Sequence, residues 1–218
     1  MRRTICIMLF LFVIASVDAA GGQEIEKNEE LPLDVQLEGL APKARIAYLR
    51  YLLGSGKVDE EVLFQLGVAF HESAEPDSAE YYYLSAIEAA PGMSKAYVNL
   101  AVLYDGRGKK TKALLKFEEA ISINPDDLLA LSHAALMHFQ MKHFSRAIEY
   151  VSRAMEVDPS HPQPHFYLAV FFWESGVYRE ALREWQMVVD LDPESQLAAS
   201  AKKQITLVQN AMRNAGND

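Results

Sequence analysis

The chain has 218 residues, of which 50% are hydrophobic and 23% are charged, and its formal net charge is −9. This composition excludes a disordered chain, and the acidic charge argues against nucleic acid and anionic lipid surfaces as partners, because both require a basic face. The only cysteine is Cys6, so the rest of the chain can form no disulfide and no cysteine metal site.

Residues 1–19 have the pattern of a secretory signal peptide. Arg2 and Arg3 precede an apolar run over residues 5–17, and small residues follow. The run is shorter than the roughly 20 residues that a membrane-spanning helix needs, which favours a signal over an anchor. Cleavage near Ala19 would place small or aliphatic residues at the two positions that the peptidase recognises. We therefore expect an exported protein, periplasmic or secreted, with no membrane span in the mature chain; an uncleaved anchor is the alternative.

A short helical segment follows a polar leader. Residues 20–33 form an acidic leader, with its acidic residues within 20–30, and are predicted to be flexible. The segment APKARIAYLRYLL, within residues 34–59, places Ile46, Leu49 and Leu53 on one side of a helix, and a Gly-Ser-Gly sequence ends it. We predict an N-terminal capping helix or a degenerate half-repeat over residues 34–59.

Four prolines divide the middle of the chain into units of equal length. They close the similar phrases AIEAAP, AISINP, AMEVDP and VVDLDP, and each proline lies 34 residues from the next. A fixed period of this size indicates a solenoid, in which each unit packs only against its neighbours. The prolines are Pro91, Pro125, Pro159 and Pro193, and the predicted units are residues 60–93, 94–127, 128–161 and 162–195.

Each unit has small residues at its positions 8 and 20 and, opposite them, a large apolar residue at position 24. Positions 4, 7, 8 and 11 share one face of a helix, and positions 20, 24 and 27 share a face of a second helix. Gly108 and Gly176 at position 15 indicate the turn between the two helices. Each unit is therefore predicted to be a helical hairpin whose backbones approach closely. The small residues are Gly67, Ala101, Ala135 and Ala169, then Ala79, Ala113, Ala147 and Ala181; the large core residues are Tyr83, Phe117, Val151 and Trp185.

A terminal helix is predicted over residues 196–213, before a short tail at 214–218. Its apolar residues recur at helical spacing and would cover the last hairpin, while polar residues face elsewhere. The stripe consists of Leu197, Ala201, Ile205, Val208 and Met212.

The repeat pattern closely resembles the tetratricopeptide repeat over residues 60–195. This resemblance implies an all-α fold, a right-handed α-solenoid of four helix-turn-helix repeats with terminal capping helices. The third unit departs from the pattern through Ala134, His138 and Val151, which would thin its core, and His165 replaces an apolar residue at position 4 of the fourth unit. Pro162 falls in the first turn of its helix, where a missing N–H is harmless.

Motifs for catalysis are weak in this sequence. Residues 105–111 have lysine and glycine in a loop, but the spacing of a phosphate-binding loop fails, and a solvated turn is the better interpretation. His71 begins a zinc-protease-like pattern that lacks its second histidine. His133, His138 and His143 recur every five residues, which spreads them around a helix; we expect His138 to be a hydrogen-bonded core residue. We therefore predict no enzyme, no metal and no cofactor.

The resemblance also implies a concave groove, lined by the first helix of each hairpin, in which a protein partner binds. The carboxylate clamp of some family members is matched by Asn99 alone, which argues against binding of an acidic C-terminal tail. Trp173 and Tyr167 are the strongest candidates because they are large. The predicted partner-binding residues are Phe64, Val68, Val98, Asn99, Val102, His133, Leu136, Phe139, Phe166, Tyr167, Val170 and Trp173; Gln65, His71, Lys95, Asp105 and Ser132 complete the face.

Our leading hypothesis from the sequence is a non-enzymatic scaffold that holds a peptide or an amphipathic helix of an envelope protein. The alternative is a structural protein that associates with further copies of itself.

Overall fold

The computed structural model describes residues 32–56 and 59–215. The predicted signal peptide (1–19), nearly all of the predicted leader (20–33) and the end of the predicted tail (214–218) lie outside the described residues. The chain divides into two compact units, residues 1–39 and 40–218. The described part of the first unit contains one short helix, α2 (Leu33–Leu37), which the sequence analysis did not predict.

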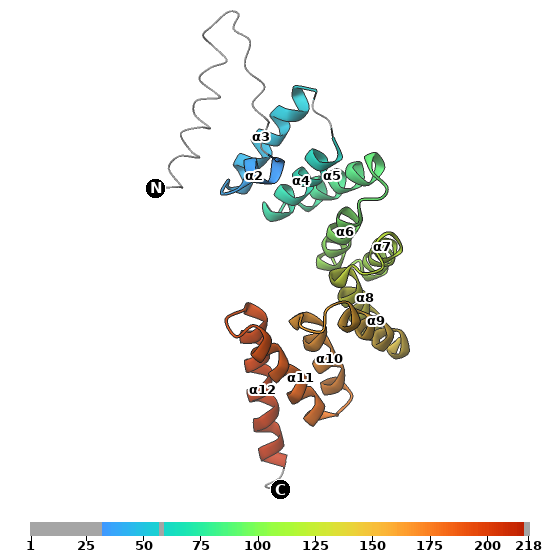
Figure 1. Cartoon of the computed structure of the whole chain (residues 1–218), viewed down its shortest axis with the longest axis vertical. Coiled ribbons are helices and arrows are strands. Elements are labelled where there is room, and N and C mark those ends of the chain that lie inside the picture. The colour runs from blue at the N-terminus through green and yellow to red at the C-terminus, as the bar shows by residue number, and fades with distance from the viewer. Residues whose placement is uncertain (1–31, 57–58, 216–218) are drawn as a thin grey trace, which may run out of the picture. The chain divides into compact units, whose positions relative to one another are not determined.

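All regular structure in the second unit, within the part that the structure describes, is helical, and the predicted all-α fold is confirmed (Figure 1). None of the helices in the described part of the chain is both long enough and apolar enough to cross a membrane. The helices are α3 (Pro42–Gly54), α4 (Glu60–Glu72), α5 (Pro76–Ala89), α6 (Ser94–Gly106), α7 (Lys110–Ile123), α8 (Leu128–Gln140), α9 (Phe144–Val157), α10 (Pro162–Glu174), α11 (Tyr178–Leu191) and α12 (Gln196–Ala215).

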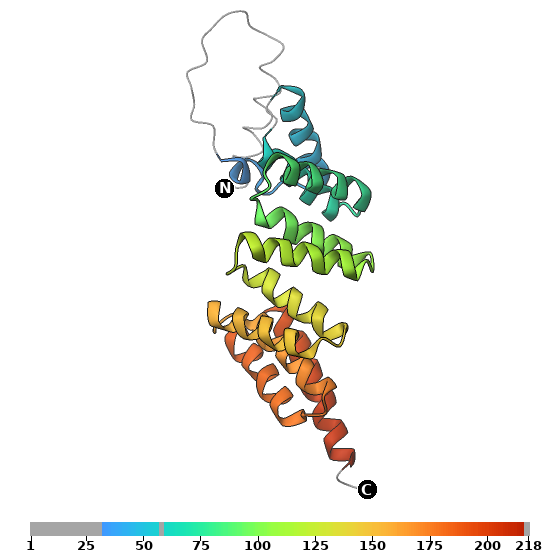
Figure 2. The ribbon, with the colours of Figure 1, turned by 90° about the vertical axis from the view of Figure 1, so that its right-hand side faces the viewer.

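The helices from α4 to α11 form four hairpins that follow the proline period. In each hairpin the second helix packs along the first, and it also contacts the helix that follows it, which is α12 for the last hairpin. Figures 1 and 2 show these pairs as successive layers from α4/α5 to α10/α11. The first helices begin at Glu60, Ser94, Leu128 and Pro162, which are 34 residues apart. First helices also contact one another, α4 with α6 and α8 with α10, so they lie together along one side of the second unit.

Each hairpin turn is made by a residue at position 15 in the left-handed backbone region. The residue after it donates its backbone N–H to a carbonyl five residues earlier, for example Lys109 to Tyr104 at 2.9 Å. This bond gives a partner to a carbonyl in the last turn of the first helix. Glycine adopts this conformation without strain, whereas a side chain makes it costly. Two turns use glycine, as predicted, and two do not: the φ angles are 57° at Ala74, 70° at Gly108, 63° at Lys142 and 77° at Gly176.

The core lies between the two helices of each hairpin. The predicted small residues at positions 8 and 20 are buried in all four units, so the backbones come close together there. Tyr83, Phe117, Val151 and Trp185, the predicted large core residues, are at most 1% exposed. His138 and His165 are buried as well, at 2% and 7% exposure, and each has polar partners.

The terminal helices pack on the hairpins with small departures from the predicted faces. In α3 the buried residues are Ile46, Leu49 and Leu52, so Leu52 replaces the predicted Leu53. In α12 the buried residues include Ala201 and Val208, but Met212 is 40% exposed. No residue of α12 after Val208 is buried among those whose side chains are described, because the last turns of this helix extend past the partners that cover its start.

Candidate protein-binding face

The predicted partner-binding residues lie on the first helices of the hairpins, α4, α6, α8 and α10. Those that are partly exposed form what we call the first-helix face. Its members are Val68, Asn99, Val102, His133, Leu136, Phe139, Phe166, Tyr167, Val170 and Trp173.

Two of the predicted residues are core residues instead. Phe64 is 6% exposed and Val98 is 4% exposed, so neither is accessible to a partner. Both occupy position 5 of their units, and Ser132 at the same position is fully buried. Position 5 is covered because neighbouring first helices lie side by side. Only in the fourth unit is this position partly exposed, at Phe166.

Beside the N-terminal members of the first-helix face, Val68, Asn99 and Val102, the residues Glu61 and Lys95 form an ion pair. Lys95 Nζ lies 2.5 Å from Glu61 Oε2 and 4.6 Å from the ring centroid of Phe64. The side-chain amide of Asn99 donates to the carbonyl of Lys95 at 3.0 Å, so this amide is already used within the helix. The charge of Lys95 and the amide of Asn99 are therefore already used within the chain.

The middle of the face is formed by His133 and Tyr167. The His133 ring stacks on Phe117, with centroids 5.1 Å apart, and meets the edge of Tyr167 at 6.0 Å. Burial lowers the pKa of His133 below its ordinary value of 6.5, against the opposing effect of the nearby Asp105 carboxylate. His133 is therefore neutral at pH 7. Tyr167 accepts a hydrogen bond from the Gln163 side chain at 2.9 Å.

The C-terminal part of the face is aromatic, and it continues onto the hairpin turns. Phe139 stacks on Phe171 at 4.1 Å and meets Phe144 at 5.4 Å. One repeat later, Trp173 meets Tyr178 at 5.0 Å in the equivalent place. Phe144 is 54% exposed and Tyr178 is 42% exposed. The sequence analysis missed these two residues; the signal was available, because both stand at position 17, five residues after an aromatic residue of the face.

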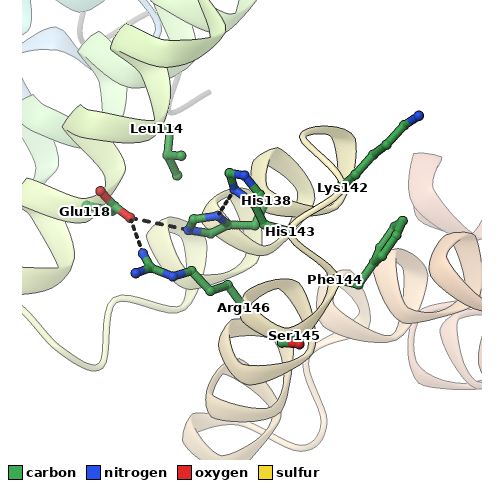
Figure 3. Close-up of a pocket in the computed structure, with 8 residues that line it drawn as sticks. All are labelled: Leu114, Glu118, His138, Lys142, His143, Phe144, Ser145 and Arg146. Carbon is green, nitrogen blue, oxygen red and sulfur yellow. Dashed lines mark hydrogen bonds and ion pairs between the residues drawn. The ribbon is translucent and has the colours of Figure 1, made fainter.

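A separate cavity of about 690 Å³ lies beside the turn between α8 and α9. Figure 3 shows Glu118 of α7 pointing toward His138 of α8 and Arg146 of α9. Glu118 Oε1 lies 3.3 Å from His138 Nε2 and 3.7 Å from Arg146 Nη1, while His138 Nδ1 lies 3.4 Å from His143 Nδ1. The prediction that His138 is a hydrogen-bonded core residue is confirmed. These side chains connect α7 of the second hairpin to α8 and α9 of the third. We therefore assign them a structural role.

The charge of His138 is controlled mainly by its burial. Burial lowers the pKa of His138, Arg146 and His143 lower it further, and Glu118 opposes them. The imidazole therefore remains neutral at pH 7.

Across the part of the chain that the structure describes, no three His, Cys, Asp or Glu side chains are grouped so that they could hold a metal ion.

The turn at residues 105–111, which superficially resembled a phosphate-binding loop, connects α6 to α7. Arg107 pairs with Asp77 at 2.8 Å and with Glu80 at 2.9 Å, and Lys109 lies 3.6 Å from Glu80. These cations are occupied by acidic residues of the preceding hairpin. The turn therefore joins neighbouring hairpins electrostatically.

Comparison with known proteins supports the repeat assignment. Two family models, both described as tetratricopeptide repeat, match residues 94–127 and residues 133–196. Human Protein O-mannosyl-transferase TMTC3 is 32% identical over 62% of this chain, and Hsp70-Hsp90 organizing protein 2 of Arabidopsis thaliana is 30% identical over 43%. The chain spans only 15% and 16% of the lengths of these two relatives.

Solved structures share the fold at low sequence identity. The tetratricopeptide-repeat protein TTC0263 of Thermus thermophilus has a TM-score of 0.64 and 18% identity, over 81% of this chain and 95% of its own. A crystal structure of MamA has a TM-score of 0.60 and 16% identity, over 79% of this chain and 98% of its own. The shared fold and the helical hairpins described above show an all-α solenoid, and residues 94–127 and 133–196 match tetratricopeptide repeats.

Proposed function

We propose that this protein is a non-enzymatic scaffold that binds a segment of a partner protein, a peptide or an amphipathic helix, on its first-helix face. Tetratricopeptide-repeat proteins generally act as protein-interaction scaffolds, which supports the proposal. One observation carries it: partly exposed apolar and aromatic side chains recur on the first helix of successive hairpins. They include Val102, Leu136, Phe139, Tyr167, Val170 and Trp173.

The chemistry of these side chains supports binding of protein. Large aromatic residues contribute most to protein interfaces, because they bury much apolar surface and lose little conformational freedom. Trp173 and Tyr167 are already held by ring contacts with Trp185 and His133, so a partner would meet ordered rings. A series of apolar side chains along successive first helices suits the apolar face of a helix or an extended apolar peptide.

The proposed location is outside the cytoplasm, in the periplasm or the medium, and the proposed partner is an envelope protein. This part rests on the charged start, short apolar run and small residues of residues 1–19. Cell fractionation with mass spectrometry of the N-terminus tests it. Recovery of the chain in the cytosol with residues 1–19 intact would reject export.

Affinity capture from an envelope extract tests the face itself. Trp173→Ala and Phe166→Ala should each lose the partner that the unchanged protein retains, because each removes aromatic surface from the face. The matched control is Tyr81→Ala, which removes an aromatic ring that is 64% exposed on α5, outside the face. Circular dichroism should show unchanged helicity for all three variants. Equal capture by the unchanged protein and the Trp173 and Phe166 variants would remove the face from the proposal.

The second candidate function, self-association, is favoured by the exposed side of α12. Leu207 is 52% exposed and Met212 is 40% exposed, although a capping helix ordinarily presents a polar outer side. Light scattering across a range of concentrations tests this candidate. A mass that rises with concentration, and that Leu207→Gln with Met212→Gln returns to the monomer value, would support it; a constant monomer mass would reject it.

A further inference from the structure

The aromatic rings of the N-terminal hairpins already have cations over them. Lys95 lies 4.6 Å from the ring of Phe64, Lys109 lies 5.3 Å from that of Tyr104, and Lys116 lies 5.5 Å from that of Tyr97. A Lys or Arg in this position is attracted to the negative face of the ring. Within the described residues, no Lys or Arg of the chain occupies such a position on the aromatic members of the C-terminal half of the first-helix face. These members are Phe139, Phe166, Tyr167 and Trp173.

The acidic side chains on the first helices differ in whether a cation of the chain pairs with them. In the N-terminal hairpins Glu61 is paired with Lys95, and Glu72 is paired with Arg45. Asp105, near the end of α6, has no hydrogen bond or ion pair through its side chain among the described residues. Its carboxylate affects the ionisation of both His133 and Tyr167, which places it near the middle of the face.

A second unpaired carboxylate lies at the C-terminal end. Glu174 is the last residue of α10, directly after Trp173, and it is exposed with no partner in the described chain. Histidine does not neutralise Asp105, because burial keeps His133 uncharged at pH 7. The middle and the C-terminal end of the face therefore combine unoccupied aromatic rings with two uncompensated negative charges, Asp105 and Glu174.

We infer that the part of the face from its middle to its C-terminal end selects a basic amphipathic helix, a partner segment that presents Lys or Arg beside its apolar residues, and that it rejects an acidic segment. This inference rests on the proposed function and specifies its ligand. The Lys or Arg groups pair with Asp105 and Glu174 and lie over the aromatic rings, while the apolar residues cover Leu136 and Val170. Complementary charge contributes mostly to selectivity, since a like charge in the same place is repelled.

The experiment compares three synthetic helical peptides with acetylated and amidated ends. They carry the same leucine stripe, and their polar side is built from lysine, from glutamate or from glutamine. Fluorescence anisotropy measures the binding of each labelled peptide to the purified full chain. The lysine peptide should bind about tenfold more tightly than the glutamate peptide, because it gains two charge pairs, with the half-buried Asp105 and the exposed Glu174, and the cation–ring contacts.

Two double variants, each of which removes two negative charges, show which carboxylates cause the preference for the lysine peptide. Asp105→Asn with Glu174→Gln should remove most of the preference for lysine. Glu149→Gln with Glu156→Gln, exposed on α9 outside the face, should leave the preference unchanged. A preference that both double variants retain comes from the overall acidic charge and overturns the inference.

The outcomes separate this inference from the proposed function. If the glutamate peptide binds as tightly as the lysine peptide, and Trp173→Ala weakens both, charge selection is rejected while the face remains a binding site. If none of the three peptides binds, the proposed binding on this face is rejected together with the inference.

Discussion

The ring of Tyr83 occupies the space that a side chain on Gly67 would need. A Cβ atom added to Gly67 would lie 2.5 Å from Cδ1 of Tyr83 and 2.6 Å from Cε1. Tyr83 is fully buried, and its hydroxyl lies 3.5 Å from His71 Nδ1. The other three units have alanine at position 8, opposite Phe117, Val151 or Trp185. The first hairpin therefore holds its two backbones together through a glycine–tyrosine contact of its own.

Gly67→Ala should destabilise the protein by about 1–3 kcal/mol, because the added methyl group overpacks the hairpin core. Helix propensity alone predicts the opposite sign, since alanine is favoured over glycine by about 1 kcal/mol inside a helix. Urea unfolding followed by circular dichroism measures the difference. Gly106→Ala is the matched control, because a Cβ there meets nothing within 4 Å, and it should not destabilise. A stable Gly67→Ala variant would show that Tyr83 moves aside at little cost.

Ala74→Gly and Lys142→Gly should each stabilise the protein by about 0.5–1 kcal/mol. Both residues have positive φ angles, which cost an L side chain roughly 1–2 kcal/mol, and part of the gain is lost to the freer unfolded chain. Thermal unfolding of the single variants checks the sign. The reverse change, Gly108→Ala at the equivalent turn, should destabilise. If both glycine variants unfold at a lower temperature, the side chains contribute contacts that outweigh the backbone cost.

His165 should stabilise the fold most at acidic pH. Its Nδ1 lies 2.7 Å from Glu184 Oε2 and its Nε2 lies 3.1 Å from the carbonyl of Pro159, so both nitrogens face acceptors and both must donate. The hydrogen bond to Glu184 raises the pKa of His165 above its ordinary value of 6.5, against the effect of burial. The stabilisation is therefore complete below pH 6.5 and is lost as the pH rises through the folded-state pKa.

His165→Gln tests this prediction through urea unfolding at pH 5.5 and pH 8.5. Glutamine can keep one hydrogen bond but cannot carry the charge. The loss of stability relative to the unchanged protein should be larger at pH 5.5 than at pH 8.5. An equal loss at the two pH values would show that the pair with Glu184 does not depend on the charge of the imidazole.

His138 should have the opposite dependence on pH. Its pKa is lowered, chiefly by burial, so the unfolded chain takes up a proton near pH 6.5 that the folded chain does not. This histidine therefore reduces stability as the pH falls below 6.5. His138→Phe, which introduces the residue found at position 11 in Phe70 and Phe172, should reduce the acid-induced loss measured by urea unfolding between pH 7 and pH 5. The pKa of His133 is also lowered, so His133 accounts for part of the acid-induced loss of stability that remains in the variant. If the variant loses as much stability between pH 7 and pH 5 as the unchanged protein, His138 is not a cause of the acid-induced loss.

Much of the fold was predictable because the interactions that define it are local in the sequence. A proline at every thirty-fourth residue ends each second helix, and small residues at positions 8 and 20 specify where two helices touch. Both signals can be read without knowledge of the neighbouring hairpin. The period also explains why the first helices begin at Glu60, Ser94, Leu128 and Pro162.

The accessible surface depended on contacts between hairpins, which no single repeat encodes. Phe64 and Phe166 stand at the same position of their units, yet only Phe166 is partly exposed, because its neighbours differ. Phe144 and Tyr178 stand at the same position of their units, but their contacts with Phe139 and Trp173 depend on how each turn packs against its first helix. Helical periodicity determines the side of a helix on which a residue lies. The packing of chain segments that are distant in sequence decides whether that side is covered. It also decides whether a carboxylate such as Asp105 has a cation as its partner.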